Sequence, residues 1–446
     1  MTRTLIALAV ASLLASPVAF ARLDASQVAH LGTDLTPTGA EKAGNADGSI
    51  PAWTGGLTQA PAGFKAGGNY ADPYASEAPL FTVSAANMAQ YAELLSPGQK
   101  AMLSTFSDYK LPVYPTHRSA ALPEAAYAAT RQQSQAVELL ANGNGLQGYS
   151  GASVPFPIPK NGLEALWNHL ARYRGNGWET SYAEFAVQAN GNFTPLIRRQ
   201  KLAPASAVSD AEPNRLLYYI TYLTAPESVA GSANLVHEPL DQVKERRLAW
   251  TYNPGQRRVL RAPEIAYDNP QQNFDGLRTT DMLDMYNGAP DRYDWTLVGK
   301  REMLIPYNTY KLQDHALKYA DIVRPGHLNQ DLLRYERHRV WVVEAKLKAG
   351  ERHIYAKRTY YLDEDSWAIV AADLYDGRGE LWRVQEAHPI QFYDVAMPYA
   401  PSEVSYDLQS RRYGVVGLRN QEAGYNFSAP AHLMDFSANA LRRMGR

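Results

Sequence analysis

The chain of 446 residues carries 44 Lys and Arg against 45 Asp and Glu, a formal net charge of −1. This balance gives no support to a nucleic-acid partner, because nucleic-acid binding needs clustered Lys and Arg that neutralise phosphates. The sequence contains no cysteine, which excludes disulfide bonds, thiol nucleophiles, thiolate zinc sites and iron–sulfur clusters. Tyr and Trp, at 29 and 8, outnumber the 11 Phe, and such aromatic residues suit half-buried sheets and apolar surfaces that meet water.

The first residues have the pattern of a cleavable signal peptide over residues 1–21. Arg3 provides a positive charge, Leu5–Leu14 is apolar, and Ala19-Phe20-Ala21 is a small-x-small cleavage site. The apolar run is too short to span a hydrocarbon core about 30 Å thick, and no later run approaches about 18 apolar residues. We therefore expect a periplasmic mature chain that begins at Arg22 and has no transmembrane segment.

Residues 22–176 alternate Pro- and Gly-rich loops with helical segments, which predicts a helix- and loop-rich N-terminal region. Helices are predicted at Ser84–Phe106, Leu122–Ala141 and Gly162–Tyr173. The first is expected to bend or split at Pro97, and the second to hold Pro123 in its first turn.

Residues 177–446 change to an apolar period of two, which predicts β-strands. Asn190-Gly191 predicts a tight turn between two of them. The clearest further runs are Arg247–Tyr252, Arg257–Arg261, Arg337–Lys348, Arg352–Leu362, Trp367–Tyr375 and Glu380–Phe392. Their short joins force antiparallel neighbours, because a parallel return needs a dozen residues or more. We expect a meander of roughly ten strands that curls or closes to protect its edges.

Alternation along these strands indicates which side chains share a face. Trp341 and Val343 lie on one face of their run, and Lys346 lies on the other. The run Leu216–Leu223 is apolar on both faces, as expected for a central strand that is covered on one side and faces a cavity or a core on the other. If the aromatic faces line a cavity, the candidate ligand-binding residues are Trp250, Tyr252, Tyr218, Tyr222, Trp341 and Val343.

Two stretches carry a family resemblance. Leu31–Gly56, which contains Asn45-Ala46-Asp47-Gly48, and Val298–Asn308 together resemble a proteobacterial family of unknown function. That family is related to LolA/LolB-like periplasmic carriers, which include the outer membrane lipoprotein-sorting proteins. The resemblance implies an α+β fold, a curved antiparallel half-open β-barrel with helices packed on its concave side. It implies no catalytic or binding residues.

Searches for catalytic and cofactor motifs favour structural interpretations. Gly143–Gly148 fits G-x-G-x-x-G, but a predicted helix precedes it, the reverse of the dinucleotide-binding context. His338 and His353 lie on adjacent predicted strands, yet too far from a third ligand for a metal site, and are expected to be solvated strand residues. No catalytic residue, metal or cofactor is therefore assigned.

An acidic cluster remains at Asp281, Asp284, Asp291 and Asp294. Paired carboxylates can perform acid–base chemistry or bind calcium. Aspartate is also a common helix-capping and turn residue, and we favour that interpretation. Asn45–Gly48 is likewise expected to be a turn.

Three functional hypotheses follow. The first is a non-enzymatic periplasmic carrier of a lipid or other hydrophobic molecule in outer-membrane or envelope transport. The second is an envelope assembly or accessory protein that uses exposed Tyr and Trp to contact an inner-membrane transporter or an outer-membrane protein, peripheral to the outer membrane. The third is a hydrolase that uses the acidic cluster near Asp281, although no nucleophile, base and orienting group can be named together.

Overall fold

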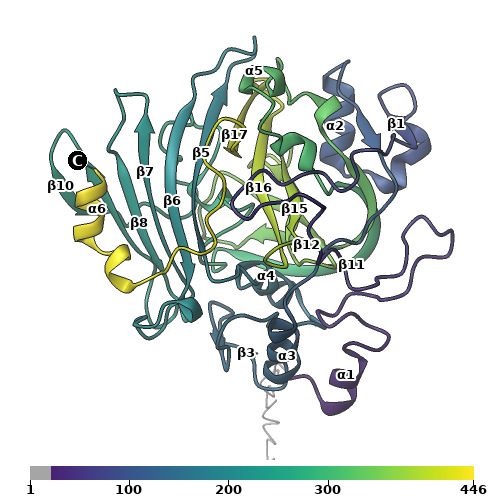
Figure 1. The fold of residues 1–446 in the computed structure, drawn as a ribbon, viewed down its shortest axis with the longest axis horizontal. Coiled ribbons are helices and arrows are strands. Elements are labelled where there is room, and N and C mark those ends of the chain that lie inside the picture. Colours follow the sequence, from purple (N-terminus) through teal and green to yellow (C-terminus); the bar gives the residue numbers. More distant parts are fainter. Residues whose placement is uncertain (1–21, 446) are drawn as a thin grey trace, which may run out of the picture.

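The computed structural model describes residues 22–445, so the predicted signal peptide lies outside the described residues. The chain is mostly sheet with a few short helices (Figure 1). None of the helices in the described range is long and apolar enough to cross a lipid bilayer. The boundary predicted between residues 176 and 177 stays a prediction, although strands on both sides of it join one sheet.

The helices of the described residues are α1 (Ala25–His30), α2 (Pro97–Thr105), α3 (Glu124–Gln133), α4 (Gly162–Leu170), α5 (Tyr319–Ile322) and α6 (Ala438–Met444), with 3-10 turns η1 (Met88–Leu94), η2 (Ala205–Ala207), η3 (Thr280–Met282), η4 (Tyr310–Gln313), η5 (Gln330–Leu332) and η6 (Leu433–Phe436). Helices α2, α3 and α4 lie within the three ranges predicted to be helical, although α3 ends earlier than expected, and α1, α5 and α6 were not predicted. The predicted split at Pro97 is confirmed, because the Ser96 side chain caps α2 there. Pro123 is the extended N-cap of α3 and does not lie inside its first turn.

Most of the strands belong to one 15-stranded sheet. They are β1 (Phe81–Val83), β2 (Leu111–Val113), β5 (Trp178–Val187), β6 (Leu196–Pro204), β7 (Leu217–Ala225), β8 (Ala233–Glu238), β9 (Leu248–Asn253), β10 (Arg258–Arg261), β11 (Tyr293–Pro306), β12 (Tyr335–Leu347), β13 (Lys357–Asp363), β14 (Ile369–Tyr375), β15 (Leu381–Phe392), β16 (Met397–Asp407) and β17 (Arg412–Leu418). A separate hairpin consists of β3 (Glu138–Leu139) and β4 (Leu146–Gln147).

Two antiparallel meanders, β5 to β10 and β11 to β17, make up the body of the sheet. They join where β17 pairs with β5, with Val415 opposite Phe185. The predicted hairpins around Asn190-Gly191 and between β9 and β10 are confirmed, as is the series β12 to β15. The strands β8, β11, β16 and β17 were not predicted.

The sheet is open within the described residues, since its order runs from β1 to β10; a half-open barrel is therefore not established. One end curls strongly, because β11 contacts β14 and β15 although β12 and β13 separate them in the sheet. Helix α2 lies inside this curl, where Gly98 N donates to Asp373 of β14 and Gln99 donates to Leu304 O of β11.

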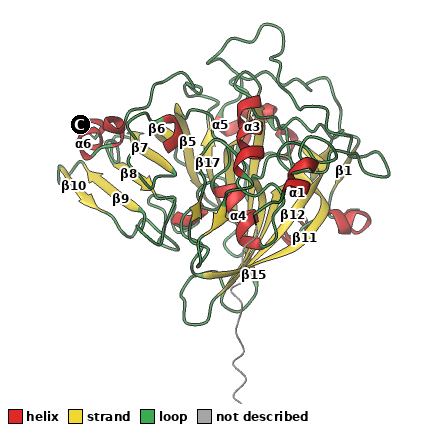
Figure 2. Ribbon diagram, turned by 90° about the horizontal axis from the view of Figure 1, so that it is seen from below, coloured by secondary structure: helices red, strands yellow, loops and turns green. Residues whose placement is uncertain are grey.

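The expectation that the helices pack on the concave side needs correction. Helix α4 packs on β11 and β12, and its core cluster includes Ala372 and Leu374 of β14. These residues alternate along the strand with Asp373, which contacts α2, so α2 and α4 cover opposite faces. Figure 2 shows α3 and α4 lying across the sheet.

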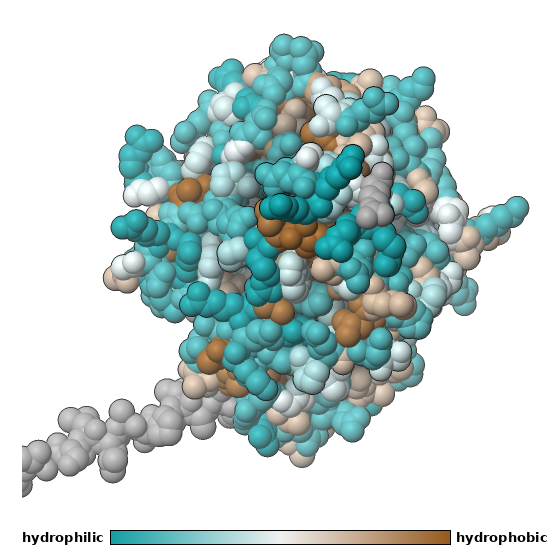
Figure 3. Space-filling model, turned by 90° about the vertical axis from the view of Figure 1, so that its left-hand side faces the viewer, coloured by the Kyte–Doolittle hydropathy of each residue, from teal (hydrophilic) through white to brown (hydrophobic). Residues whose placement is uncertain are grey.

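The C-terminal segment covers one face of the first meander. Helix α6 packs on β8, β9 and β10, and its Leu441 is buried with Phe436, Tyr218 and Ile220. The side of the molecule that carries α6 and β10 is mainly hydrophilic, with small, separate hydrophobic patches (Figure 3). The other face of these strands bears the site described next.

Candidate functional site

A cavity of about 240 Å³ lies against the first meander, on the face opposite α6. Leu217, Tyr219 and Thr221 of β7 line it, whereas the intervening Tyr218 and Ile220 pack toward α6. The prediction that this strand is covered on one side and faces a cavity or a core on the other is confirmed, and of these two the structure has a cavity. The volume lies just below the roughly 300 to 1,000 Å³ of typical ligand pockets.

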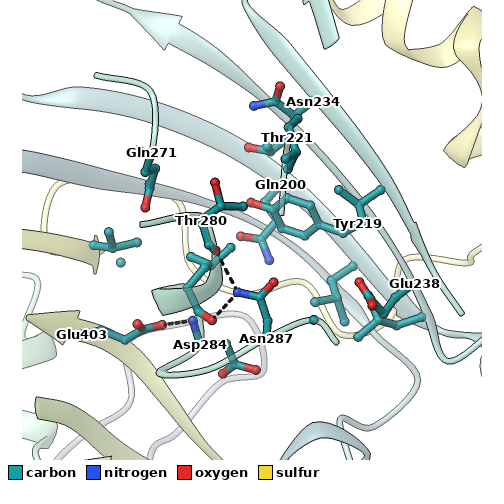
Figure 4. A pocket seen from close by; sticks show the side chains of 18 of the residues that line it. Gln200, Tyr219, Thr221, Asn234, Glu238, Gln271, Thr280, Asp284, Asn287 and Glu403 are labelled. Atoms are coloured by element: carbon teal, nitrogen blue, oxygen red, sulfur yellow. Dashed lines mark hydrogen bonds between the residues drawn. The ribbon is translucent and has the colours of Figure 1, made fainter. Parts of the chain in front are cut away.

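The walls of the cavity come from both meanders and from the irregular chain between them. Strands β5 to β9 supply one wall, β16 and β17 supply another, and segments 264–272 and 280–288 close it (Figure 4). Its apolar lining includes Leu170, Leu202, Leu216, Val236 and Leu283.

Amide side chains add polar groups to this lining. Gln200, Asn234 and Gln271 line the cavity (Figure 4). Asn234 Oδ1 and Gln271 Oε1 are buried and have no hydrogen-bond partner in the described residues. A buried polar atom left unpaired costs roughly 1–3 kcal/mol, so these oxygens favour occupants that can donate hydrogen bonds. The cavity thus combines apolar walls with polar points, a pattern typical of sites for amphipathic molecules.

Two ion pairs hold charged groups along the wall. Arg198 Nε lies 2.5 Å from Glu184 Oε1, and Arg247 Nε lies 2.6 Å from Glu238 Oε2. Burial raises the pKa of Glu184, and Arg198 opposes that rise. Each carboxylate is paired with its own arginine, although Glu184 Oε2 is buried without a hydrogen-bond partner in the described residues.

The floor of the cavity contains a second charge cluster around Asp284. Arg172 pairs with Asp284, and Arg174 Nη2 donates to Asp284 Oδ2 at 2.9 Å. Burial alone would raise the pKa of Asp284, but the two arginines hold it well below its usual value. Asp284 and Met285 have positive φ, and their successive N–H groups donate to the Glu403 carboxylate at 2.8 and 3.2 Å. Such a nest of N–H groups binds an anion and helps retain a strained backbone.

The predicted ligand-binding residues lie elsewhere. Trp250, Tyr252, Tyr218 and Tyr222 belong to the cluster that packs under α6. Val343 is buried in the cluster under α4, and Trp341 packs against the same cluster. The structure therefore brings four of the six together, but under a helix and not in the cavity, because α6 covers the face that they share. No observation tests whether any of them contacts a ligand, so that role stays a prediction.

Asp281 lies in the first turn of η3, in agreement with the expected turn role, but Thr279 is the N-cap, and the Asp281 side chain forms a buried ion pair. Its Oδ2 accepts from Arg358 at 2.6 Å and pairs with His353 at 3.1 Å. Asp284 pairs with other arginines, so the two carboxylates do not form an acid–base pair. The geometry therefore gives no support to a hydrolase at this cluster.

The two histidines expected to be solvated are buried. His353 pairs with Asp281, and His338 Nε2 lies 3.1 Å from Glu336 Oε2. Burial lowers the pKa of His353, and Arg358 adds to the effect. The expectation failed because exposure depends on what covers a strand.

His338, Asp363 and Asp365 are buried and place one possible metal-ligand atom each within 4.8 Å of one another. Both Asp365 oxygens already accept from Arg118, at 2.6 and 2.9 Å. A metal ion would have to displace that arginine, so we assign no metal to this group.

Several of the charged cavity residues that the sequence analysis missed lie outside the periodic strands. Arg174 precedes β5, Asp284 lies in an irregular segment, and Arg419 follows β17. The one available signal was the second apolar face of β7, which carries Leu217 and Tyr219.

Two sequence comparisons identify relatives of this chain. A family model described as "Protein of unknown function (DUF1329)" matches residues 82–442. The uncharacterized protein PA3922 of Pseudomonas aeruginosa is 52% identical over 440 residues, 97% of this chain and 96% of that protein.

Similar solved structures are more distant. A domain of Vibrio parahaemolyticus named as an outer membrane lipoprotein-sorting protein domain is 17% identical, with a TM-score of 0.44, over 63% of this chain and 98% of that one. A DUF1329 family protein of Desulfovibrio piger is 13% identical, with a TM-score of 0.41, over 60% and 92%. The LolA superfamily protein NE2245 of Nitrosomonas europaea is 12% identical, with a TM-score of 0.36, over 60% and 93%. At these scores the similarities identify no ligand.

Proposed function

We propose that this protein, which belongs to the DUF1329 family, is a non-enzymatic periplasmic carrier of a lipid or other amphipathic molecule in outer-membrane or envelope transport. The observation that carries the proposal is the unfilled cavity beside β5 to β9, with aliphatic walls and unpaired amide oxygens. Protein interiors are normally close-packed. An apolar wall left unfilled is therefore best explained by an occupant.

The free energy of exposing an acyl chain to water explains why such a carrier is needed. Exposing a sixteen-carbon acyl chain to water costs roughly 13 kcal/mol, at about 0.8 kcal/mol per CH₂. A cavity of about 240 Å³ suits one acyl segment or a small ring system better than a whole phospholipid. Segment 280–288 is anchored by the ion pairs of Asp281 and Asp284. Segment 264–272, which also closes the cavity, lies outside the strands, so it can move to admit a larger ligand while the sheet stays intact.

The accessory-protein hypothesis has less support. It requires exposed Tyr and Trp, whereas the large hydrophobic residues most exposed in residues 22–445 are Leu80, Val243, Leu260, Val298, Ile354 and Met434. These are aliphatic or Met side chains, and scattered single residues of this kind are normal on protein surfaces.

A matched pair of variants on β6 tests the carrier proposal. Gln200 points into the cavity (Figure 4) and has no side-chain partner among the described residues. Gln200→Trp should therefore fill the space and lower the affinity for a fluorescent long-chain fatty acid at least tenfold. Its neighbour Arg199 is exposed on the opposite face, so Arg199→Trp should leave affinity within twofold of wild type.

The assay is a fluorescence titration of delipidated protein, with circular dichroism to confirm folding. Organic extraction of protein purified from its own periplasm, followed by mass spectrometry, would identify a native ligand. Folded, delipidated wild-type protein that binds neither fatty acids nor lysophospholipids would overturn the proposal. Equal losses in the two variants would place the binding site elsewhere.

A further inference from the structure

The floor of the cavity carries more positive than negative charge. Four buried guanidinium groups lie in or behind this floor beside two carboxylates: Arg172, Arg174, Arg278 and Arg419 against the partly exposed Asp284 and the buried Glu403. Of the four arginines, Arg174 and Arg419 line the cavity itself. Arg278 neutralises Glu403, at 2.8 Å. Arg172 and Arg174 share the single carboxylate of Asp284.

Arg419 is the least neutralised member of this group. It is 6% exposed and lines the cavity, yet no carboxylate lies within 4.0 Å of it in the described part of the chain. Its hydrogen bonds go to neutral oxygens: Thr180 Oγ1 at 2.9 Å, Pro401 O at 2.6 Å and Gly417 O at 2.5 Å. The Tyr425 ring lies 4.2 Å from the guanidinium carbon. These contacts orient the cation without cancelling its charge.

The remaining acids along the cavity do not supply the missing counter-ion. Glu184 and Glu238 form their ion pairs with Arg198 and Arg247 and not with Arg419, and Glu264 is exposed. Buried charges are usually paired, because removing an ion from water without a partner is strongly unfavourable. An uncompensated arginine on a cavity wall therefore indicates a place for an anion from outside the chain.

Building on the proposed carrier function, we infer that the ligand is an amphipathic anion, whose carboxylate or phosphate head binds at Arg174 and Arg419 while its apolar part lies against Leu202 and Val236. All four residues line the same cavity. Arg174, Leu216 and Leu217 also line a neighbouring cavity of about 310 Å³ that contains Arg172 and Arg215. A larger head group has room there without leaving the arginines.

Arg419 suits this role because Nε and Nη1 hold it against neutral oxygens, while no hydrogen bond from Nη2 is found in the described residues. Nη2 can therefore donate a charge-assisted hydrogen bond to a carboxylate or phosphate oxygen. A purely structural explanation is that Arg419 only holds β16 and β17 together just beyond the end of their ladder, through Pro401 O and Gly417 O. That explanation predicts no preference between charged and neutral ligands, so the two explanations are separable in wild-type protein.

The test compares three probes on full-length mature protein at pH 7.5 and low salt. They are a pyrene-labelled long-chain fatty acid, its methyl ester, and inorganic phosphate alone as a competitor. We expect the acid to bind at least tenfold more tightly than the ester, which corresponds to about 1.4 kcal/mol. Inorganic phosphate alone should displace the acid only at millimolar concentration, because it lacks the apolar part.

Variants then assign the preference to residues. Arg419→Gln should reduce the preference for the acid below threefold and leave the affinity for the ester unchanged. Arg419→Lys keeps the positive charge and should retain most of the preference for the acid. Arg258→Gln, exposed on the edge strand β10, is the control and should change neither affinity. Should Arg419→Gln fail to fold, wild-type protein still tests the anion subsite. Its affinity for the acid relative to the ester should exceed tenfold at low salt and decrease as the salt concentration rises.

Each outcome has one interpretation. Equal binding of acid and ester by wild-type protein overturns the anion subsite but leaves the carrier proposal standing. Binding of neither probe overturns the carrier proposal and the subsite with it. Displacement by inorganic phosphate at the same concentration as by unlabelled fatty acid would show a free-anion site and overturn the assignment to a lipid head group.

Discussion

Asp281→Asn should destabilise the fold by about 3 kcal/mol, the lower end of the roughly 3–5 kcal/mol that breaking a buried ion pair costs. Asp281 is 3% exposed and Arg358 is wholly buried, so the variant leaves a buried guanidinium without its carboxylate. Three contacts of Arg358 soften the loss: the hydroxyls of Tyr293 and Tyr360, at 3.1 Å each, and the His353 ring. Equilibrium unfolding in urea at pH 7, followed by tryptophan fluorescence, measures the change.

The same pair predicts the direction of the pH dependence. Burial alone would raise the pKa of Asp281, but Arg358 and the hydrogen bond to His353 hold it well below its usual value. A depressed folded-state pKa means that the stabilisation is present above the unfolded pKa of about 3.9 and is lost as pH falls below it. The difference in the free energy of unfolding between wild type and Asp281→Asn should therefore decrease at acidic pH.

Asp294→Asn is the control. Because Asp294 is exposed on β11, this variant should change the free energy of unfolding by no more than about 0.5 kcal/mol in either direction. The double variant Asp281→Asn with Arg358→Met should lose less than the two single variants together, since the two residues share one interaction. An Asp281→Asn protein as stable as wild type would refute the ion-pair argument. Loss of a hydrolytic activity without loss of stability would restore the hydrolase hypothesis.

Three further predictions concern other parts of the molecule. EDTA should leave the thermal midpoint unchanged, because the Asp365 oxygens are bound to Arg118; a fall of several degrees would show a structural metal. Gly417→Ala should lower the free energy of unfolding by well over 2 kcal/mol, because Gly417 has φ +93° and a Cβ would lie 2.0 Å from a backbone oxygen. Gly350→Ala, with φ +87° and open space around the Cβ, should lower it by about 1 kcal/mol in the same unfolding assay. Trp341→Glu should lower stability by about 1–3 kcal/mol and leave fatty-acid affinity unchanged, because this residue packs under α4; a tenfold loss of affinity in folded protein would return it to the binding site.

Local patterns predicted the strands well where alternation was clean. In β12, Trp341 and Val343 lie on the face that packs under α4, and Lys346 is exposed on the other, as the alternation indicates. The strand β11 escaped prediction because its pattern is interrupted at Gly299, where a bulge shifts the register against β12. A bulge exchanges the two faces, so the period of two is lost there.

The sequence alone could not predict what each face of a strand would contact. Tyr218 and Tyr219 are adjacent in β7 and chemically identical, yet one packs under the C-terminal segment and the other lines the cavity. That difference depends on where α6 lies, which is set by residues far along the chain. The buried pairs have the same limitation, because nothing local to Asp281 indicates that Arg358 will contact it.

The cavity exists only because the two meanders join. β17 pairs with β5, and this pairing brings Arg419, just after β17, to the same cavity as Arg174, just before β5. Each arginine alone could be solvated in an unfolded chain, so their charge becomes costly only when the sheet is complete. An anion that binds both would offset that cost in the folded state alone, and would stabilise the fold by about 2.7 kcal/mol at a hundred times its Kd. Because the site takes residues from both meanders, that stabilisation should protect the amides of β5 and β17 together in hydrogen exchange, whereas a ligand that contacted only β5 to β9 would protect the first meander alone.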